Sequence, residues 1–172
     1  YVNAERNQVA VAYRGTKNLA GWIEDLKGIV LGQADTPQKR LAFSTAEKAK
    51  QHALSKKAQL TFTGHSLGAY LAELSVFYIQ AHLAIGFINN DYDIRHYVSA
   101  VTFESPGSQD IMEQLQSQLP HEKRDLRAFD ITEYVSYPNF INTWNQHVGT
   151  LYSLIPKIIE PSFLKQLTGM EL

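Results

Sequence analysis

The stretch from residue 61 to residue 72, TFTGHSLGAYLA, constrains the fold more than any other part of the sequence. Gly64, Ser66 and Gly68 match the G-x-S-x-G pattern of a nucleophile elbow, a tight strand-to-helix turn that projects a serine hydroxyl into solvent. Because such a turn strains the backbone at the serine, side chains two residues before and after it would collide, and glycine removes the collision. Ser66 is therefore a candidate nucleophile, provided that a strand precedes it and a helix follows it.

The flanking residues predict both elements. Residues 59–63 form a short β-branched and aromatic run, which is typical of a buried strand. Residues 69–85 contain no proline and are apolar around most of the helix circumference, until Gly86 can end the helix. A helix that is apolar on nearly every side is a buried one, and an accidental match to the pattern in a surface loop would lack this context.

Composition narrows the class of protein. The 172 residues most simply form one domain over residues 1–172. The 16 Lys and Arg nearly balance the 17 Asp and Glu, so we expect no overall field that would favour nucleic acid. Cysteine is absent, which excludes disulfides, thiolate zinc sites and a cysteine nucleophile. The sequence has neither an apolar run of the roughly 18 residues of a membrane span nor a signal-peptide profile, so we leave the compartment open, with a lean towards secretion.

A second segment carries a backbone feature of acyl-transfer sites. Residues 8–13 form a compact apolar run that predicts a strand, and this strand leaves through Arg14, Gly15 and Thr16. Glycine at a strand exit lets the backbone approach a ligand closely, and acyl transfer needs two backbone N–H groups aimed at the developing oxyanion. The residue after the nucleophile, Leu67, would supply one donor, and Thr16 is our candidate for the second.

The rest of the chain alternates between helical and strand patterns. We expect an amphipathic helix at residues 18–26, which is either a core helix or a lid over an apolar site. A capping-box pattern predicts that a helix starts at the beginning of residues 44–57. Strands are predicted at residues 97–103 and 126–137, with a helix at residues 109–119 between them. This alternation predicts an α/β fold with a parallel sheet and helical crossovers.

Three spaced blocks resemble the class 3, fungal-type lipases of the α/β-hydrolase superfamily. VAYRGT at residues 11–16, with residues 22–26 behind it, is similar to the family's oxyanion-hole strand and lid segment, and TFTGHSLGAYLA is similar to its elbow. VTFESPG at residues 101–107 resembles the next strand and turn, where glycine more often stands at the place of Glu104. The resemblance implies an α/β-hydrolase-like, mostly parallel sheet with helices on both faces, here as a truncated core.

The same resemblance assigns the site. Ser66 becomes the nucleophile, and Thr16 and Leu67 become the oxyanion donors. The nucleophile also needs a base and an acid, in the chain order Ser, Asp, His. The family's acid position falls on Asn139, and asparagine can orient an imidazole but has no charge to stabilise the imidazolium.

Two further residues are open as triad members. Asp130, inside the strand expected at residues 126–137, is the nearest alternative acid. His147 lies in a segment that resembles an H-x-G segment of the family. In the family the histidine of that segment is not the catalytic one, which usually lies further towards the C-terminus. Either His147 has become the base of a shortened site, or the catalytic histidine lies beyond Leu172. We therefore expect this chain to be the core of a longer protein.

The sequence thus predicts a serine ester hydrolase that acts on lipid esters, of lipase or phospholipase type, through an acyl-enzyme on Ser66. No metal and no organic cofactor are implied. The expected partners are a lipid or small ester substrate and, transiently, a membrane or lipid surface, with no nucleic acid. Two alternatives stay open: a lipase-fold binding module that has lost turnover, and an acyltransferase that uses the same serine.

Overall fold

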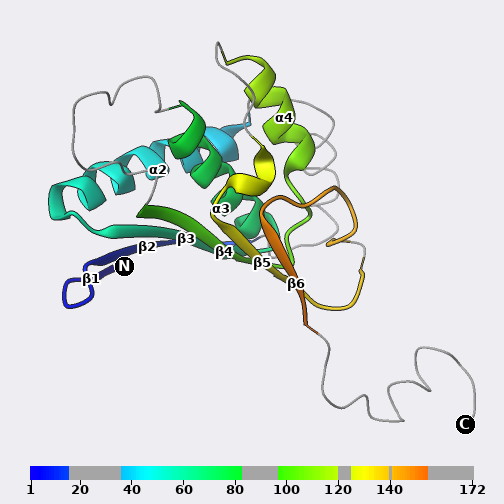
Figure 1. The fold of residues 1–172 in the computed structure, drawn as a ribbon, viewed down its shortest axis with the longest axis horizontal. Helices are drawn as coiled ribbons and strands as arrows, with labels where there is room; N and C mark the ends of the chain where they lie inside the picture. Colours follow the sequence, from blue (N-terminus) through cyan, green and yellow to red (C-terminus); the bar gives the residue numbers. More distant parts are fainter. Residues whose placement is uncertain (16–35, 83–96, 120–124, 140, 155–172) are drawn as a thin grey trace, which may run out of the picture.

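The computed structural model describes residues 1–15, 36–82, 97–119, 125–139 and 141–154 (Figure 1). Thr16 and the segment expected as a helix or lid at residues 18–26 lie outside these ranges. In chain order the elements are β1 (Val2–Asn3), β2 (Gln8–Tyr13), α2 (Pro37–Lys56), β3 (Gln59–His65), α3 (Leu67–Phe77), the π-helical turn η1 (Tyr78–His82), β4 (Val98–Phe103), α4 (Gln109–Ser117), the 3-10 turn η4 (Leu126–Ala128), β5 (Ile131–Val135) and β6 (Thr150–Ser153).

The strands form one sheet in the order β1-β2-β3-β4-β5-β6. Among the described strands, only β1 runs antiparallel to its neighbour, and β2 to β6 pair in parallel. Because the strands are parallel, the loops that follow β2, β3, β4 and β5 leave from one edge, which we call the carboxyl edge. The register places His65 beside Phe103, and Phe103 beside Tyr134, at this edge. The predicted α/β class with a mostly parallel sheet is confirmed.

The hydrophobic core lies between this sheet and the helices. All residues of α3 are buried, as its apolar sequence predicts, and the helix packs against β3, β4 and α2. In Figure 1 the described helices α2, α3 and α4 lie on one face of the sheet, so the second helical layer that the resemblance implies is not among the described residues. Full burial of a side chain such as Phe62 contributes about 2–3 kcal/mol.

The start of α2 differs from its prediction. The helix begins at Pro37 and not at the capping-box pattern in residues 44–47, which lies inside it. Thr36 is the N-cap residue, and its Oγ1 accepts a hydrogen bond from the Lys39 N–H at 3.2 Å. Proline at the first helical position has the required φ and lacks the N–H that would have no partner there. Thr36 and Pro37 therefore begin the helix more effectively than the residues chosen from the sequence.

The strand predicted at residues 126–137 is also shorter in the structure. The side chain of Asp125 accepts a hydrogen bond from the Arg127 N–H and caps η4, which occupies the first part of that range. The strand itself is Ile131–Val135, so Asp130 precedes it. None of the helices within the described ranges is long and apolar enough to cross a membrane.

Candidate active site

Ser66 lies at the carboxyl edge, in the turn between β3 and α3. Its backbone has φ 59° and ψ −125°, a conformation that L-residues rarely adopt and that costs about 1–3 kcal/mol. Hydrogen bonds hold it there: the Ser66 N–H donates to the Phe103 carbonyl at 3.0 Å, and the Ser66 carbonyl accepts from Ala69 N and Tyr70 N at 2.9 and 3.2 Å. Helix α3 and strand β4 thus fix the serine in the strained geometry expected of an elbow.

The two glycines around Ser66 are required by close backbone contacts. A Cβ on Gly64 would lie 2.3 Å from the Gly68 carbonyl, and a Cβ on Gly68 would lie 2.3 Å from the carbonyl oxygen of Tyr13. A Cβ on Gly15 would likewise lie 2.7 Å from the carbonyl oxygen of His65. The exit of β2 therefore packs directly against the elbow.

This packing bears on the predicted oxyanion donors. Leu67 is the first residue of α3, so its N–H has no acceptor within the helix, and a helix N-terminus favours negative charge. Gly15 brings the loop after β2 to the same turn. Thr16, the predicted second donor, lies outside the described residues and keeps that role as a prediction.

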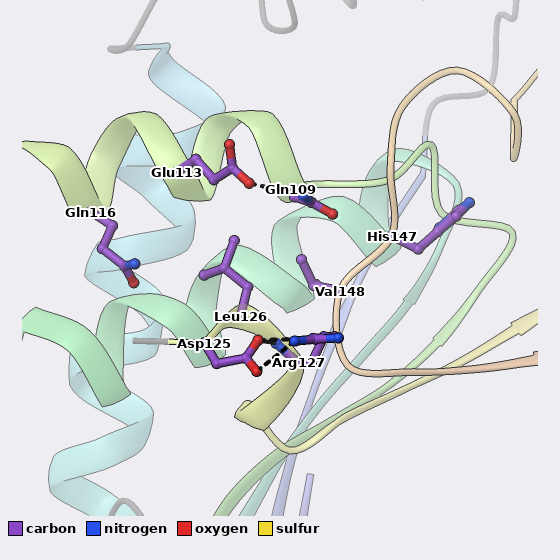
Figure 2. Close-up of a pocket in the computed structure, with 8 residues that line it drawn as sticks. All are labelled: Gln109, Glu113, Gln116, Asp125, Leu126, Arg127, His147 and Val148. Atoms are coloured by element: carbon purple, nitrogen blue, oxygen red, sulfur yellow. Dashed lines mark hydrogen bonds and ion pairs between the residues drawn. The ribbon is translucent and has the colours of Figure 1, made fainter. Parts of the chain in front are cut away.

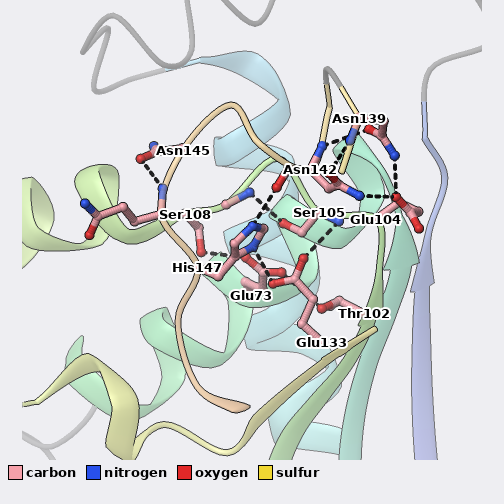
Figure 3. A network of polar contacts seen from close by, with 12 residues as sticks. Glu73, Thr102, Glu104, Ser105, Ser108, Glu133, Asn139, Asn142, Asn145 and His147 are labelled. Carbon is pink, nitrogen blue, oxygen red and sulfur yellow. Dashed lines mark hydrogen bonds and ion pairs between the residues drawn. The ribbon is translucent and has the colours of Figure 1, made fainter. Parts of the chain in front are cut away.

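Two glutamates are buried beneath this edge, and the sequence reasoning missed both (Figure 3). Glu73, on α3, accepts hydrogen bonds from Thr102 Oγ1 at 3.0 Å and from Ser108 Oγ at 2.5 Å. Burial, and then the charge of Glu133, raise the pKa of Glu73 to about 7, although hydrogen bonds from Ser108, Ser105 and Thr102 oppose the shift. Ser108 precedes α4 but does not cap it with its side chain, because its hydroxyl bonds to Glu73.

His147, the candidate base, is bound to the second buried glutamate. Its Nδ1 lies 2.8 Å from Glu133 Oε2, and its Nε2 lies 2.7 Å from the carbonyl oxygen of Asn142. A carbonyl can only accept, so Nε2 carries a proton. The hydrogen bond to Glu133 is the main cause that raises the pKa of His147. Neither nitrogen is free in this arrangement to take a proton from Ser66.

Asn139, which the sequence comparison suggested for the acid position, is a hydrogen-bond donor to the carboxylate of Glu104 (Figure 3). Its Oδ1 accepts from Ile141 N and Asn142 N at 2.9 and 3.0 Å, so that oxygen shapes the loop after β5. Its Nδ2 donates to Glu104 Oε2 at 2.9 Å. The sequence reasoning did not consider Glu104 for the site, although its departure from the more usual glycine was a signal.

Comparisons with known proteins agree with this geometry. The family model described as lipase (class 3) matches residues 10–132, which include β3, the elbow and α3. The chain belongs to the class 3 lipase family. It is also 30% identical over 171 residues to an uncharacterized protein, RP165, of Rickettsia prowazekii (strain Madrid E), covering 92% of this chain. The chain spans 42% of the length of that relative.

Asp130, the alternative acid, is misplaced for a class 3 lipase triad. It directly precedes β5, and its carbonyl oxygen accepts from Ala100 N at 2.8 Å, towards the amino ends of the parallel strands. Ser66 follows the last residue of the parallel strand β3, at the opposite edge. Five residues of extended strand place the two edges roughly 16 Å apart, which is beyond the reach of a triad contact. The expectation that Asp130 lies inside the strand was wrong, because the strand begins at Ile131.

His147 is also one of the residues that line a pocket of about 620 Å³ (Figure 2). The ion pair between Asp125 and Arg127, at 3.1 Å, forms part of its wall. Ser66 is not among the described residues that line this pocket. In this lipase-family chain the pocket is therefore separate from the elbow.

Proposed function

We propose that this chain is the core of a serine ester hydrolase that acts on lipid esters, of lipase or phospholipase type. The observation that carries the proposal is the strained backbone of Ser66, φ 59°, at the start of the buried helix α3. Membership of the class 3 lipase family supports it. Strain of this kind persists only where the surrounding structure enforces it, and Gly64 and Gly68 are packed to do so.

The proposed reaction is acyl transfer to water in two steps. Ser66 Oγ attacks the acyl carbonyl carbon of the ester while a base removes the hydroxyl proton. The N–H groups of Leu67 and Thr16 stabilise the oxyanion that forms, and the alcohol leaves with the proton from the base. Water then attacks the acyl-serine by the same route, which releases the carboxylic acid and regenerates the Ser66 hydroxyl.

The first step needs a base that takes the proton of the Ser66 hydroxyl. His147 could act only after its Nε2 loses its proton and leaves the carbonyl oxygen of Asn142; its contact with Glu133 could stay. We therefore favour a histidine outside the described residues, in this chain or in the rest of the protein, as the proton acceptor. A positioned base contributes about 10²–10⁴-fold to such a step.

Labelling by a fluorophosphonate probe tests the proposal directly. The full-length protein and its Ser66→Ala variant are treated with the probe, and hydrolysis of a short-chain ester is measured alongside. We expect labelling and turnover in the first protein and neither in the second. Absence of Ser66-dependent labelling in folded full-length protein would contradict the proposal.

One observation favours a second candidate, a lipase-fold binding module without turnover. Asn139 carries no charge at the family's acid position, and both ring nitrogens of His147 already have partners. A binding module would hold a lipid or ester without cleaving it. Measurable hydrolysis that disappears in Ser66→Ala rules this candidate out.

A further inference from the structure

Glu104 lies beside the elbow at the carboxyl edge. It directly follows Phe103, the last residue of β4, whose carbonyl accepts the Ser66 N–H at 3.0 Å. The register pairs Phe103 with His65, the residue before Ser66. Ser66 and Glu104 therefore leave adjacent strands at matching positions, each one residue past the paired residues.

The carboxylate of Glu104 reaches across the edge to the loop after β5 (Figure 3). Its Oε1 accepts from Ser136 N at 2.5 Å, and its Oε2 accepts from Asn139 Nδ2 at 2.9 Å and from Asn142 Nδ2 at 2.8 Å. Asn139 is the residue at the family's acid position. A carboxylate is thus present at that position, but it comes from the neighbouring strand.

The surroundings keep this carboxylate ionised. Partial burial would raise the pKa of Glu104, but hydrogen bonds from Ser136, Asn139 and Asn142 outweigh it and lower the pKa. All three partners are uncharged, so none of them neutralises Glu104 as an ion pair would. An ionised carboxylate is what a triad needs in order to stabilise the imidazolium of its base.

The backbone of Glu104 is also strained. Its φ is 51°, in the left-handed region that favours glycine. Glycine would relieve the strain but would remove the carboxylate. Strained non-glycine residues concentrate at functional sites, and an observed outlier is a sound starting point for a functional hypothesis.

We propose that Glu104 is the triad acid of this protein: a positioning residue whose carboxylate accepts the Nδ1–H of the catalytic histidine and takes the place of the carboxylate missing at residue 139. The inference rests on the proposed function. The other acidic candidates are less suitable. Asp130 lies at the opposite edge. Glu133 is fully buried and holds His147, whose Nε2 already donates to the Asn142 carbonyl.

The test compares Glu104→Gln, Glu104→Asp and the exchange variant Glu104→Gln with Asn139→Asp in the full-length protein. Steady-state hydrolysis of a soluble ester is measured from pH 5 to pH 9, with Asp130→Asn as a matched acid-to-amide control. We expect Glu104→Gln to lower kcat by roughly 10²–10⁴-fold with little change in KM. In the pH profile of kcat/KM for this variant, the acidic limb should move to lower pH by about one unit or more. The reason is that the catalytic imidazole loses a neighbouring negative charge, which lowers its pKa. Glu104→Asp and the exchange variant should each have a kcat at least about tenfold higher than that of Glu104→Gln.

A purely structural role for Glu104 gives a different result. If Glu104 only fastens the loop, Glu104→Gln lowers activity in proportion to the folded fraction, measured by circular dichroism, and the pH profile keeps its midpoints. That outcome, or a kcat near that of the unmodified protein, overturns the proposal while Ser66-dependent turnover stands. If the unmodified protein itself shows no Ser66-dependent turnover, the proposed function fails, and the role of Glu104 fails with it.

Discussion

His147 and Glu133 form a buried pair, with Nδ1 and Oε2 2.8 Å apart and the glutamate side chain fully shielded from solvent. Glu133 occupies an inward-facing position of β5, between Ile131 and Val135, and its Oε1 also accepts from Ser105 N at 3.1 Å. One carboxylate therefore connects the loop after β4 with the loop that carries His147. These contacts give His147 a structural role.

Removal of His147 should destabilise the fold. His147→Ala leaves a buried carboxylate without its partner, and breaking a buried pair in this way costs about 3–5 kcal/mol. His147→Gln can still donate to Glu133 and should lose less. Urea unfolding measures both losses. A double-mutant cycle of His147→Ala, Glu133→Gln and the variant that carries both changes then measures the coupling between the two side chains.

The same variants test the role of His147 as a base. We expect folded His147→Gln to keep its Ser66-dependent labelling rate, since the proposed chemistry uses another histidine. If His147→Gln unfolds like the unmodified protein but has lost labelling, His147 is the base, and the contact between its Nε2 and the Asn142 carbonyl must open during the reaction.

Glu73 should make stability depend on pH. Its folded pKa is raised to about 7 from 4.5, so the folded state keeps a proton that the unfolded state has already lost. Stability should therefore fall as pH rises from about 4.5 to about 7, by a few kcal/mol at most. The raised pKa of His147 acts in the same direction, because its contribution is complete below 6.5 and is lost as pH rises through the folded value.

Glu73→Gln should flatten this dependence. The amide has nearly the same shape as the carboxyl group but does not ionise. The free energy of unfolding of the variant should therefore change less between pH 5 and pH 8 than that of the unmodified protein. Glu113→Gln, which alters an exposed glutamate on α4, is the matched control and should keep the full dependence. Equal slopes for the two variants would show that Glu73 is not the titrating group.

The elbow could be predicted from the sequence because its constraints are local. Two glycines, a serine and a buried helix lie within about twenty residues, and each is required by the same turn. The contact between Glu104 and Asn139 spans 35 residues and depends on a positive φ, so no periodicity reveals it. Glu73 and Glu133 were visible as charges at buried positions of a helix and a strand, but their partners follow only from the fold.

Asp130→Asn should leave catalysis unchanged. Asp130 is exposed and precedes β5, whereas the proposed chemistry occurs where β3 ends. We expect kcat/KM of the variant to stay within about twofold of that of the unmodified protein, since surface substitutions away from special features shift energies by about 0.5 kcal/mol or less. A loss of more than about tenfold, with unfolding unchanged, would return Asp130 to the list of triad candidates.

Gly64→Ala and Gly68→Ala should each damage the fold at the elbow. The added Cβ would lie 2.3 Å from backbone atoms of Gly68 in the first variant and of Tyr13 in the second, and backbone cannot move aside as a flexible side chain can. We expect a loss of at least about 3 kcal/mol in the free energy of unfolding, together with loss of Ser66 labelling. His65→Ala, next to the nucleophile but exposed, is the control and should change stability by less than about 1 kcal/mol. If either glycine variant unfolds like the control, the backbone at Ser66 is free to relax, and strain cannot be what positions its hydroxyl.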